Sequence, residues 1–317
     1  MPAPLNPSSA RVVDPILTTL AQGYGQAEFV GHRLFPRVPV TARGGQILEF
    51  GKESFRRYAS RRAPGARTAR IEWGYVGKPF TLYPDALEAP VPREIAQDAS
   101  VVPGIDLGRG AVATVMRSLL LTQECDQAHL ATTASNYEGD SVLALSGGAK
   151  WSASTGNPIA DIDSGREVIR RKCGLYPNLV TMSATAFNAA RNNPNVLARV
   201  MQGGKPVEPA QVTREALAIL FNVDEVVVGS AIEFVGGSSR DIWGDDVVLA
   251  YVPKGFAGNA MDLAQPSYGY TYTLNGHPLV ESPYWEQQSK SWIYGVTFER
   301  APVLSGIASG FLIKGVR

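Results

Sequence analysis

The chain has 317 residues, 44% of them hydrophobic and 19% charged, and its formal net charge is +1. This composition excludes a disordered or fibrous chain, and the near-zero charge argues against a coat that neutralises nucleic-acid phosphate along its whole length. No apolar run approaches the ~18 residues of a membrane span and the first residues lack a secretion signal, so we expect a protein that is neither secreted nor membrane-embedded.

The first 43 residues predict an extended arm, because six prolines prevent any long regular element. Only Ile16 to Gln22 favours a short helix. The arm also carries apolar side chains that need burial: Ile16, Leu17, Leu20, Phe29, Leu34 and Phe35. Either they embrace a neighbouring subunit or they strap the arm across its own domain, and both alternatives stay open.

Residues 44–83 predict an extended β-hairpin. One strand contains Ile47, Leu48 and Phe50, and alternation at Ile71, Trp73 and Tyr75 indicates a second. The connection between them is too long for a tight turn. From Arg43 to Arg70 there are eight basic and two acidic residues, a net charge of +6, and the basic side chains include Arg56, Arg57, Arg61, Arg62, Arg67 and Arg70.

An isolated hairpin is marginal in water, and this one crowds like charges, so something outside it must stabilise it. Just downstream lies an acidic run formed by Asp85, Glu88, Glu94 and Asp98. A basic projection and an acidic base on one chain suit a head-to-tail contact between identical subunits. Charge alone leaves two other readings open: a solvated basic loop and a phosphate-binding arm.

A long amphipathic helix is predicted from Asp106, whose carboxylate suits the N-cap, to about Ala134. Its apolar side chains recur at three- and four-residue steps and then drift around the helix: Val112, Val115, Met116, Leu119 and Leu120, then Leu121, Cys125 and Ala128. Such a helix is roughly 40 Å long, and we interpret it as the spine of the molecule.

The region after the spine predicts an α+β fold with a small mixed sheet. A strand pair is expected over 141–151 with a turn at Gly147-Gly148, and a capping box at Ser164 to Glu167 opens a helix that Gly174 closes. Further strands are expected over 178–182, 225–234, 246–252, 268–274, 292–298 and 310–316, and further helices over 184–201, with a break at Asn193-Pro194, and over 213–221.

Residues that carry catalysis or bind metal are scarce. The chain has three histidines and two cysteines. Cys125 and His129 share one helical face, but no second ligand pair has zinc-like spacing. Asp161 and Asp163 are explained by a helix start. We therefore predict no enzyme, no catalytic residue, no cofactor, no metal and no disulfide between Cys125 and Cys173.

The order of parts resembles the major capsid proteins of tailed bacteriophages, which have the Hong-Kong-97-type fold. The resemblance covers nearly the whole chain and rests on ordered segments: RRAPGAR returning through RTARIEWGYV, LYPDALEAPVPREI, the long helix, PIADIDSGREVIRRKCGLYPNLVTMSATAFNAARNNPNVLARV, TREALAILFNVDEVVVGSAI and WGDDVVLAYVPK.

The resemblance implies an N-terminal arm (1–43), an extended loop (44–83), a peripheral domain (84–175 and 263–317) holding the spine helix 106–134, and an axial domain (176–262). It also implies a structural protein that self-assembles as pentamers and hexamers into an icosahedral head around double-stranded DNA. The expected partners are copies of itself, portal, scaffolding and decoration proteins, and DNA bound non-specifically. The expected location is the virion, after assembly in the host cytoplasm.

Two features depart from parts of the family. No charged helical segment precedes the arm, so we expect no internal scaffolding domain. Lys52 and Lys78 lie where some members form a covalent cross-link, but no acid and asparagine partner is identifiable. Two alternatives to a phage shell stay open: an encapsulin-like compartment enclosing protein cargo, and a nucleic-acid-binding module that uses residues 56–70.

Overall fold

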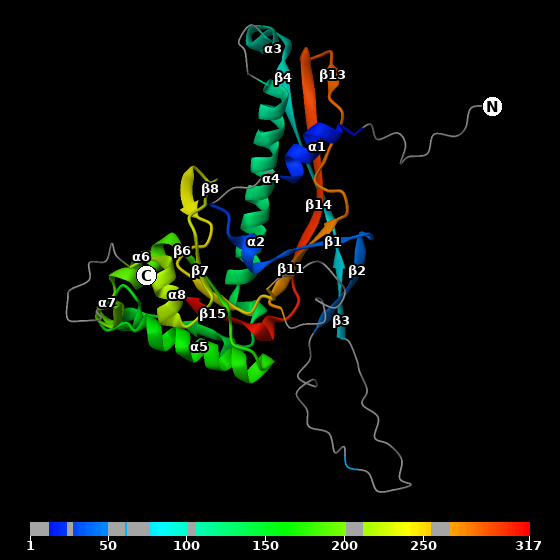
Figure 1. Ribbon diagram of the computed structural model, residues 1–317. Coiled ribbons are helices and arrows are strands. Elements are labelled where there is room, and N and C mark those ends of the chain that lie inside the picture. Colours follow the sequence, from blue (N-terminus) through cyan, green and yellow to red (C-terminus); the bar gives the residue numbers. More distant parts are fainter. Residues whose placement is uncertain are drawn as a thin grey trace.

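The structure is a computed structural model and describes residues 13–23, 28–49, 61, 76–100, 106–200, 212–254 and 267–317. It has an elongated part, in which strands run alongside helix α4, and a compact part with helices around a second sheet (Figure 1). The strand predicted at Ile71 to Tyr75 lies outside the described residues.

The predicted spine is α4, Leu107–Thr132. Asp106 caps it as expected, since its carboxylate accepts a hydrogen bond from the Arg109 amide at 3.0 Å. The predicted apolar positions Val112, Val115, Met116, Leu119 and Ala128 are buried. The expected drift is wrong at Leu121 and Cys125, which are half-buried, because the second half of the helix buries polar side chains instead: Gln123, Glu124 and Gln127.

A six-stranded sheet lines α4. Its longest strand is β14, Ser291–Leu304, which pairs with β4 (Tyr83–Pro92), β11 (Gly269–Leu274), β12 (Leu279–Val280) and β13 (Tyr284–Glu286). Strand β1, Arg37–Val40, extends the sheet by pairing parallel to β11. Val296 and Phe298 of β14 pack against the apolar face of α4.

Strand β4 hydrogen-bonds to β14 alone among the described strands. It carries prolines at 84, 90 and 92, which are even numbers of positions apart and therefore face the same way along the strand. Proline fits an edge strand where its missing N–H would face away from the partner, and it blunts that edge against further pairing.

The described arm packs mostly on its own chain. Helix α1 (Pro15–Gln22) confirms the predicted short helix, and α2 (Gly31–Leu34) follows. Phe29, Leu34 and Phe35 are buried, so this part of the arm packs across its own domain. Ile16, in contrast, is 68% exposed. Helix α3, Arg93–Ser100, follows β4 in the chain and precedes the spine.

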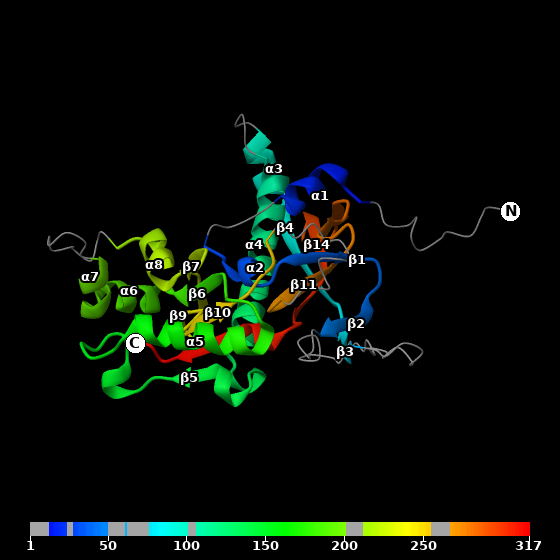
Figure 2. The same ribbon diagram turned by 60° about the horizontal axis from the view of Figure 1, so that its bottom comes forward.

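The compact part is built on a five-stranded sheet in the order β5-β15-β10-β6-β7. These strands are β5 (Val142–Ala144), β15 (Gly310–Lys314), β10 (Val247–Ala250), β6 (Leu179–Ser183) and β7 (Glu225–Gly229). Helices α5 (Pro158–Cys173), α6 (Ala184–Asn192), α7 (Pro194–Val200) and α8 (Arg214–Phe221) surround it (Figure 2). One apolar core joins α5 and β15 to the residues between 180 and 249.

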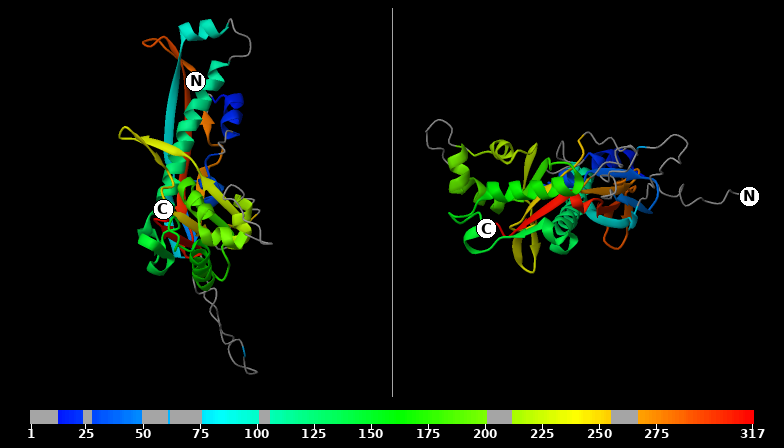
Figure 3. Two further views of the ribbon diagram at one scale, coloured as in Figure 1. Left: turned by 90° about the vertical axis from the view of Figure 1, so that its left-hand side faces the viewer. Right: turned by 90° about the horizontal axis from the view of Figure 1, so that it is seen from below.

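Two hairpins leave these sheets. Strands β2 (Gly44–Glu49) and β3 (Val76–Thr81) form the described base of the extended loop. Strands β8 (Ile232–Val235) and β9 (Ser238–Asp241) form a second hairpin, which projects from one broad face of the molecule (Figure 3). Gly236 and Gly237 make its turn with positive φ angles of 62° and 85°.

Three local predictions were wrong. Ser141 to Trp151 forms no strand pair, because β5 pairs in parallel with β15 and residues 147–149 form a 3₁₀ turn. Helix α5 begins at Pro158 with Asn157 as its N-cap, so the capping box lies inside the helix. The single strand expected over 225–234 is two strands in different sheets. Gly174 closes α5 as predicted, with a φ of 75°.

Candidate inter-subunit interface

The base of the extended loop is fixed to its own subunit. Arg43 donates two hydrogen bonds to the Glu299 carboxylate of β14, at 2.6 and 2.8 Å, and Glu299 is almost fully buried. On the returning strand, the Phe80 ring stacks on Tyr272 with centroids 4.3 Å apart. A bidentate ion pair and a stacked ring pair therefore fix the base of the extended loop to the six-stranded sheet.

The arginines predicted for the interface fall mostly outside the described residues, namely Arg56, Arg57, Arg62, Arg67 and Arg70. Arg61 is described and is exposed. The cross-link candidate Lys52 is also outside, whereas Lys78 is on β3. The contact that these arginines make with another subunit stays a prediction.

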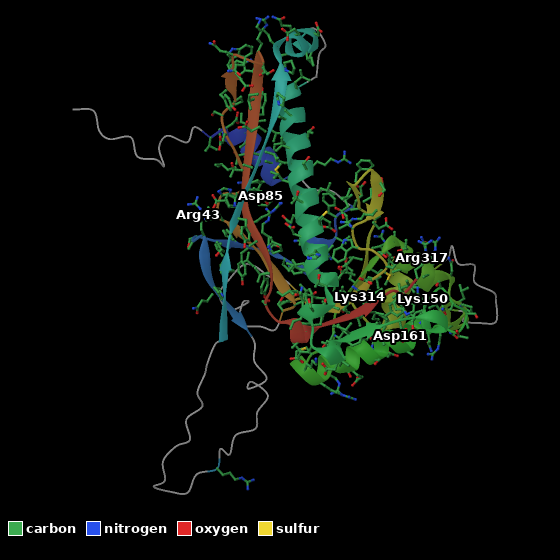
Figure 4. All side chains as sticks on the ribbon, turned by 180° about the vertical axis from the view of Figure 1, so that it is seen from behind. Arg43, Asp85, Lys150, Asp161, Lys314 and Arg317 are labelled. Carbon is green, nitrogen blue, oxygen red and sulfur yellow. The ribbon has the colours of Figure 1, made fainter. Side chains whose placement is uncertain are left out.

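The four acidic residues predicted as their counterpart lie on two neighbouring elements of the chain, β4 and α3. Asp85 on β4 pairs with buried Arg300 of β14 at 3.2 Å. Glu88 accepts a hydrogen bond from the Tyr284 hydroxyl at 3.2 Å, and Glu94 lies 3.5 Å from Arg93. Asp98 is exposed on α3. Asp85 is thus engaged within its own subunit, and Figure 4 shows it on the strand beside the spine.

Arg300 is a buried cation that ties β14 to the spine. Its guanidinium donates to the Leu119 carbonyl at 2.6 Å and to Gln123 Oε1 at 3.1 Å. Burial lowers the pKa of Arg300 to about 10, and the charge of Asp85 opposes this shift. Arg300 therefore stays protonated at neutral pH and is paired where it is buried.

Glu124 joins three segments at one point of the spine. Its carboxylate accepts hydrogen bonds from the amides of Val30 and Gly31 in the arm and from Trp243 Nε1, at 2.7 to 3.1 Å. Burial raises the pKa of Glu124, against the effect of these three donors. No sequence pattern marks this junction, because a glutamate in mid-helix is usually solvent-facing.

A groove of about 690 Å³ lies between the spine and the β8–β9 hairpin. Cys125 Sγ contacts Glu233 Oε2 at 3.7 Å here, and Glu233 pairs with Arg240 at 2.6 Å. Burial together with the charge of Glu233 raises the pKa of Cys125 to about 11, so the thiol is protonated at neutral pH and is a poor nucleophile.

The described part of the chain contains no group of three or more His, Cys, Asp or Glu side chains arranged to hold a metal. Cys125 and Cys173 are both free thiols. Asp161 accepts a hydrogen bond from Trp151 Nε1 at 2.8 Å, and Asp163 pairs with Arg166 at 3.2 Å, which accounts for this acidic pair structurally. Among the described helices, none has both the length and the apolar character needed to cross a membrane.

Comparisons with known proteins agree with this architecture. The family model described as phage major capsid protein E matches residues 136–301. The major capsid protein of Burkholderia phage BcepMu is 35% identical over 312 residues, which cover 98% of each chain. A phage-related protein from Bordetella bronchiseptica RB50 has a solved structure that is 43% identical, with a TM-score of 0.79 over 97% of this chain and 98% of that one.

More distant structures share the fold alone. The capsid of cyanophage P-SCSP1u has a TM-score of 0.59 at 10% identity, covering 98% of this chain and 92% of that one. The SrpI encapsulin complex of Synechococcus elongatus has a TM-score of 0.52 at 12% identity, covering 89% and 85%. With a matching family model and a relative similar over its whole length, the chain belongs to the phage major capsid proteins of the E family and has the Hong-Kong-97-type fold.

Proposed function

We propose that this protein assembles as pentamers and hexamers into an icosahedral phage head that encloses double-stranded DNA. The observation that carries the proposal is the 35% identity to a phage major capsid protein over 98% of both chains. The subunit has no substrate in this role. Its work is to make many modest contacts, which together become durable because a subunit held by one neighbour meets the next at high effective concentration.

The extended loop is the element that reaches the neighbouring subunit in this proposal. Its base is fixed by Arg43 and Phe80, so a contact made beyond the base transmits force to the six-stranded sheet rather than to a loose strand pair. The arginines at 56, 57, 61, 62, 67 and 70 supply its charge. Among the predicted acidic counterparts, Asp98 is exposed. Glu88 and Glu94 are also exposed, although each contacts a side chain of its own subunit, and Asp85 is paired with buried Arg300.

The peripheral and axial domains have different roles in this proposal. The peripheral domain (84–175 and 263–317) carries the spine, and the axial domain (176–262) meets its copies at the fivefold and sixfold centres. The shared apolar core of α5, β15 and the axial strands supports a rigid junction between them, in which α5 and β15 move with the axial part. The other proposed partners are portal, scaffolding and decoration proteins, with DNA bound non-specifically, and assembly takes place in the host cytoplasm.

Electron microscopy and sedimentation of the purified recombinant chain test the proposal. We expect closed shells of megadalton mass with local fivefold and sixfold symmetry. A chain that stays a 34.0 kDa monomer at high concentration, with scaffold supplied, contradicts it.

A cellular compartment shell is the second candidate, and the likeness to the SrpI encapsulin favours it at the level of the fold. Particles purified from an infected or induced host distinguish the two. Packaged DNA supports the phage head, and a copurifying tagged enzyme without DNA supports the compartment.

A further inference from the structure

The β8–β9 hairpin exposes an apolar strand that its own subunit leaves uncovered. Phe234 is 74% exposed, Ile232 55% and Val235 48%. A two-stranded hairpin is marginal alone in water, and clustered exposed apolar side chains mark interaction surfaces. Because the hairpin projects from a broad face of the molecule (Figure 3), this strand is open to another molecule.

The groove beside the hairpin is acidic. Its lining includes five carboxylates and two guanidinium groups: Asp126, Glu233, Asp241, Asp245 and Asp246, with Arg240 and Arg317. Glu233 is paired with Arg240, and Asp246 lies 3.4 Å from Lys314. Among the described residues, no Lys or Arg lies within ion-pair distance of Asp126, Asp241 or Asp245, and Asp245 accepts a hydrogen bond from the Thr185 hydroxyl at 2.8 Å. The surface is therefore apolar on the hairpin and negatively charged along its foot.

One segment of this protein has the complementary chemistry. Residues 53–70 contain six arginines and one glutamate, and two aromatic side chains, Phe55 and Tyr58, stand beside the first arginine pair. Aromatic rings suit the exposed apolar strand, and guanidinium groups suit the unpaired carboxylates. Arg61, the one described residue of this segment, is exposed.

The fold indicates that the segment comes from another copy. Figure 4 shows Arg43, at the base of the extended loop, and Arg317, which lines the groove, on opposite sides of the spine. Strands β2 and β3 leave the subunit on the side away from the β8–β9 hairpin (Figure 1). The spine therefore separates the loop of one subunit from the groove of the same subunit. The loop of a neighbouring subunit in a shell approaches the groove from outside and does not have to cross the spine.

We propose that the β8–β9 hairpin and the acidic groove at its foot form the docking surface for residues 53–70 of an adjacent copy. This inference rests on the proposed shell function and names the counter-surface of its loop. It gives the loop arginines a partner in Asp126, Asp241 and Asp245 instead of Asp85.

Mixed cross-linking tests the contact directly. In a Cys125→Ser background, one subunit carries Arg61→Cys and another carries Asp241→Cys, and the two are co-assembled and treated with a short bis-maleimide. We expect dimer-sized bands from mixed particles and none from the unassembled mixture. The matched control replaces Asp241→Cys by Asp163→Cys, an exposed aspartate of α5, and gives no dimer. Mixed particles that form normally but give no dimer with Asp241→Cys overturn the inference.

Charge exchange provides an independent readout. Asp241→Lys with Asp245→Lys is expected to abolish particles, and adding Arg61→Glu with Arg62→Glu in the same chain is expected to restore them. If the aspartate exchange leaves particle yield unchanged while the arginine exchange abolishes it, the loop contact stands and the groove is not its partner. If the unaltered chain forms no particles at all, the shell function itself fails.

Discussion

Glu124 is a carboxylate placed where an apolar side chain would ordinarily lie. It is 2% exposed, and Gly31 is held so close that a Cβ there would lie 2.9 Å from Glu124 Oε2 and 2.1 Å from Gln127 Oε1. The arm can reach the carboxylate only because residue 31 lacks a side chain. Gly31 and Glu124 therefore form one unit, although they are 93 positions apart in the chain.

Replacing Glu124 by alanine removes the acceptor of three N–H donors. Each buried donor left without a partner costs about 1–3 kcal/mol, so we expect Glu124→Ala to destabilise the unassembled subunit by roughly 3–5 kcal/mol. Urea unfolding followed by tryptophan fluorescence measures this loss. Glu233→Ala, on the exposed hairpin, is the control, and an equal loss in both variants would contradict the role given to Glu124.

The same carboxylate makes stability depend on pH. The pKa of Glu124 in the folded state lies above the ordinary value of 4.5. The contribution of this raised pKa to the free energy of unfolding is therefore fully present below pH 4.5 and is lost as pH rises through the folded-state pKa. Glu124→Gln cannot titrate. We therefore expect the free energy of unfolding of the parent chain, minus that of Glu124→Gln, to fall as the pH of urea titrations rises above 4.5, and an increase would contradict the direction of the shift.

Asn193 makes a second junction with a single side chain. Its amide nitrogen donates to the carbonyls of Trp151 and Gly156 at 2.8 and 3.1 Å, and it is 1% exposed. Asn193→Asp keeps the shape but points a carboxylate at these carbonyls, so we expect a loss on the order of 3–5 kcal/mol in thermal or urea unfolding. Asn192→Asp, next in the chain and exposed, should cost far less.

At the scale of elements, sequence reasoning succeeded where the signal was local. The Asp106 cap, the break of the 184–201 helix at Pro194 and the Gly174 stop each depend on a few adjacent residues. It failed where the deciding partner is distant. Strand β5 pairs with β15, about 170 residues away. Position 165, inside α5, requires glycine because a Cβ there would lie 2.7 Å from the Phe311 ring. No local pattern reveals such neighbours.

The extended loop illustrates both outcomes. The hairpin was predicted, and the charge of its tip is read directly from the sequence. Its base could not be predicted, because Glu299 and Tyr272, which hold it, belong to the last strands of the chain. The predicted acidic counterpart is adjacent to the loop in sequence, but Asp85 of that group pairs with Arg300 of its own subunit.

Arg43 controls the base of this element. Arg43→Ala removes the two hydrogen bonds that Arg43 donates to the buried Glu299 carboxylate, so we expect faster hydrogen exchange in 44–49 and 76–81, with little change in the five-stranded sheet. Hydrogen-exchange mass spectrometry of the unassembled subunit measures this. Arg33→Ala removes an exposed pair with Glu225 and is the control. Equal exchange in the parent chain and Arg43→Ala would show that the Phe80–Tyr272 stack alone suffices.

At the scale of the whole molecule, charge is separated without being in excess. The chain carries 30 basic and 29 acidic residues, so hundreds of copies can approach one another without strong repulsion. The basic residues of 53–70 and the acidic groove are local departures from this balance. A shell of such subunits is held partly by attraction between unlike patches, and salt weakens attraction between exposed charges.

Particle assembly should therefore depend on ionic strength, because salt weakens the attraction of the loop arginines to the neighbouring subunit. We expect the salt concentration that halves particle yield, measured by light scattering and sedimentation, to fall for Arg61→Ala with Arg62→Ala, and the remaining yield to vary less with salt than that of the parent chain. The control pair is Arg171→Ala with Arg199→Ala, two exposed arginines of the compact part, which removes the same charge and should leave the salt profile unchanged. If both pairs shift the profile equally, net charge alone governs assembly. A shift confined to the loop pair assigns the attraction to the contact between subunits, because the two double variants differ in where the charge is removed and not in how much.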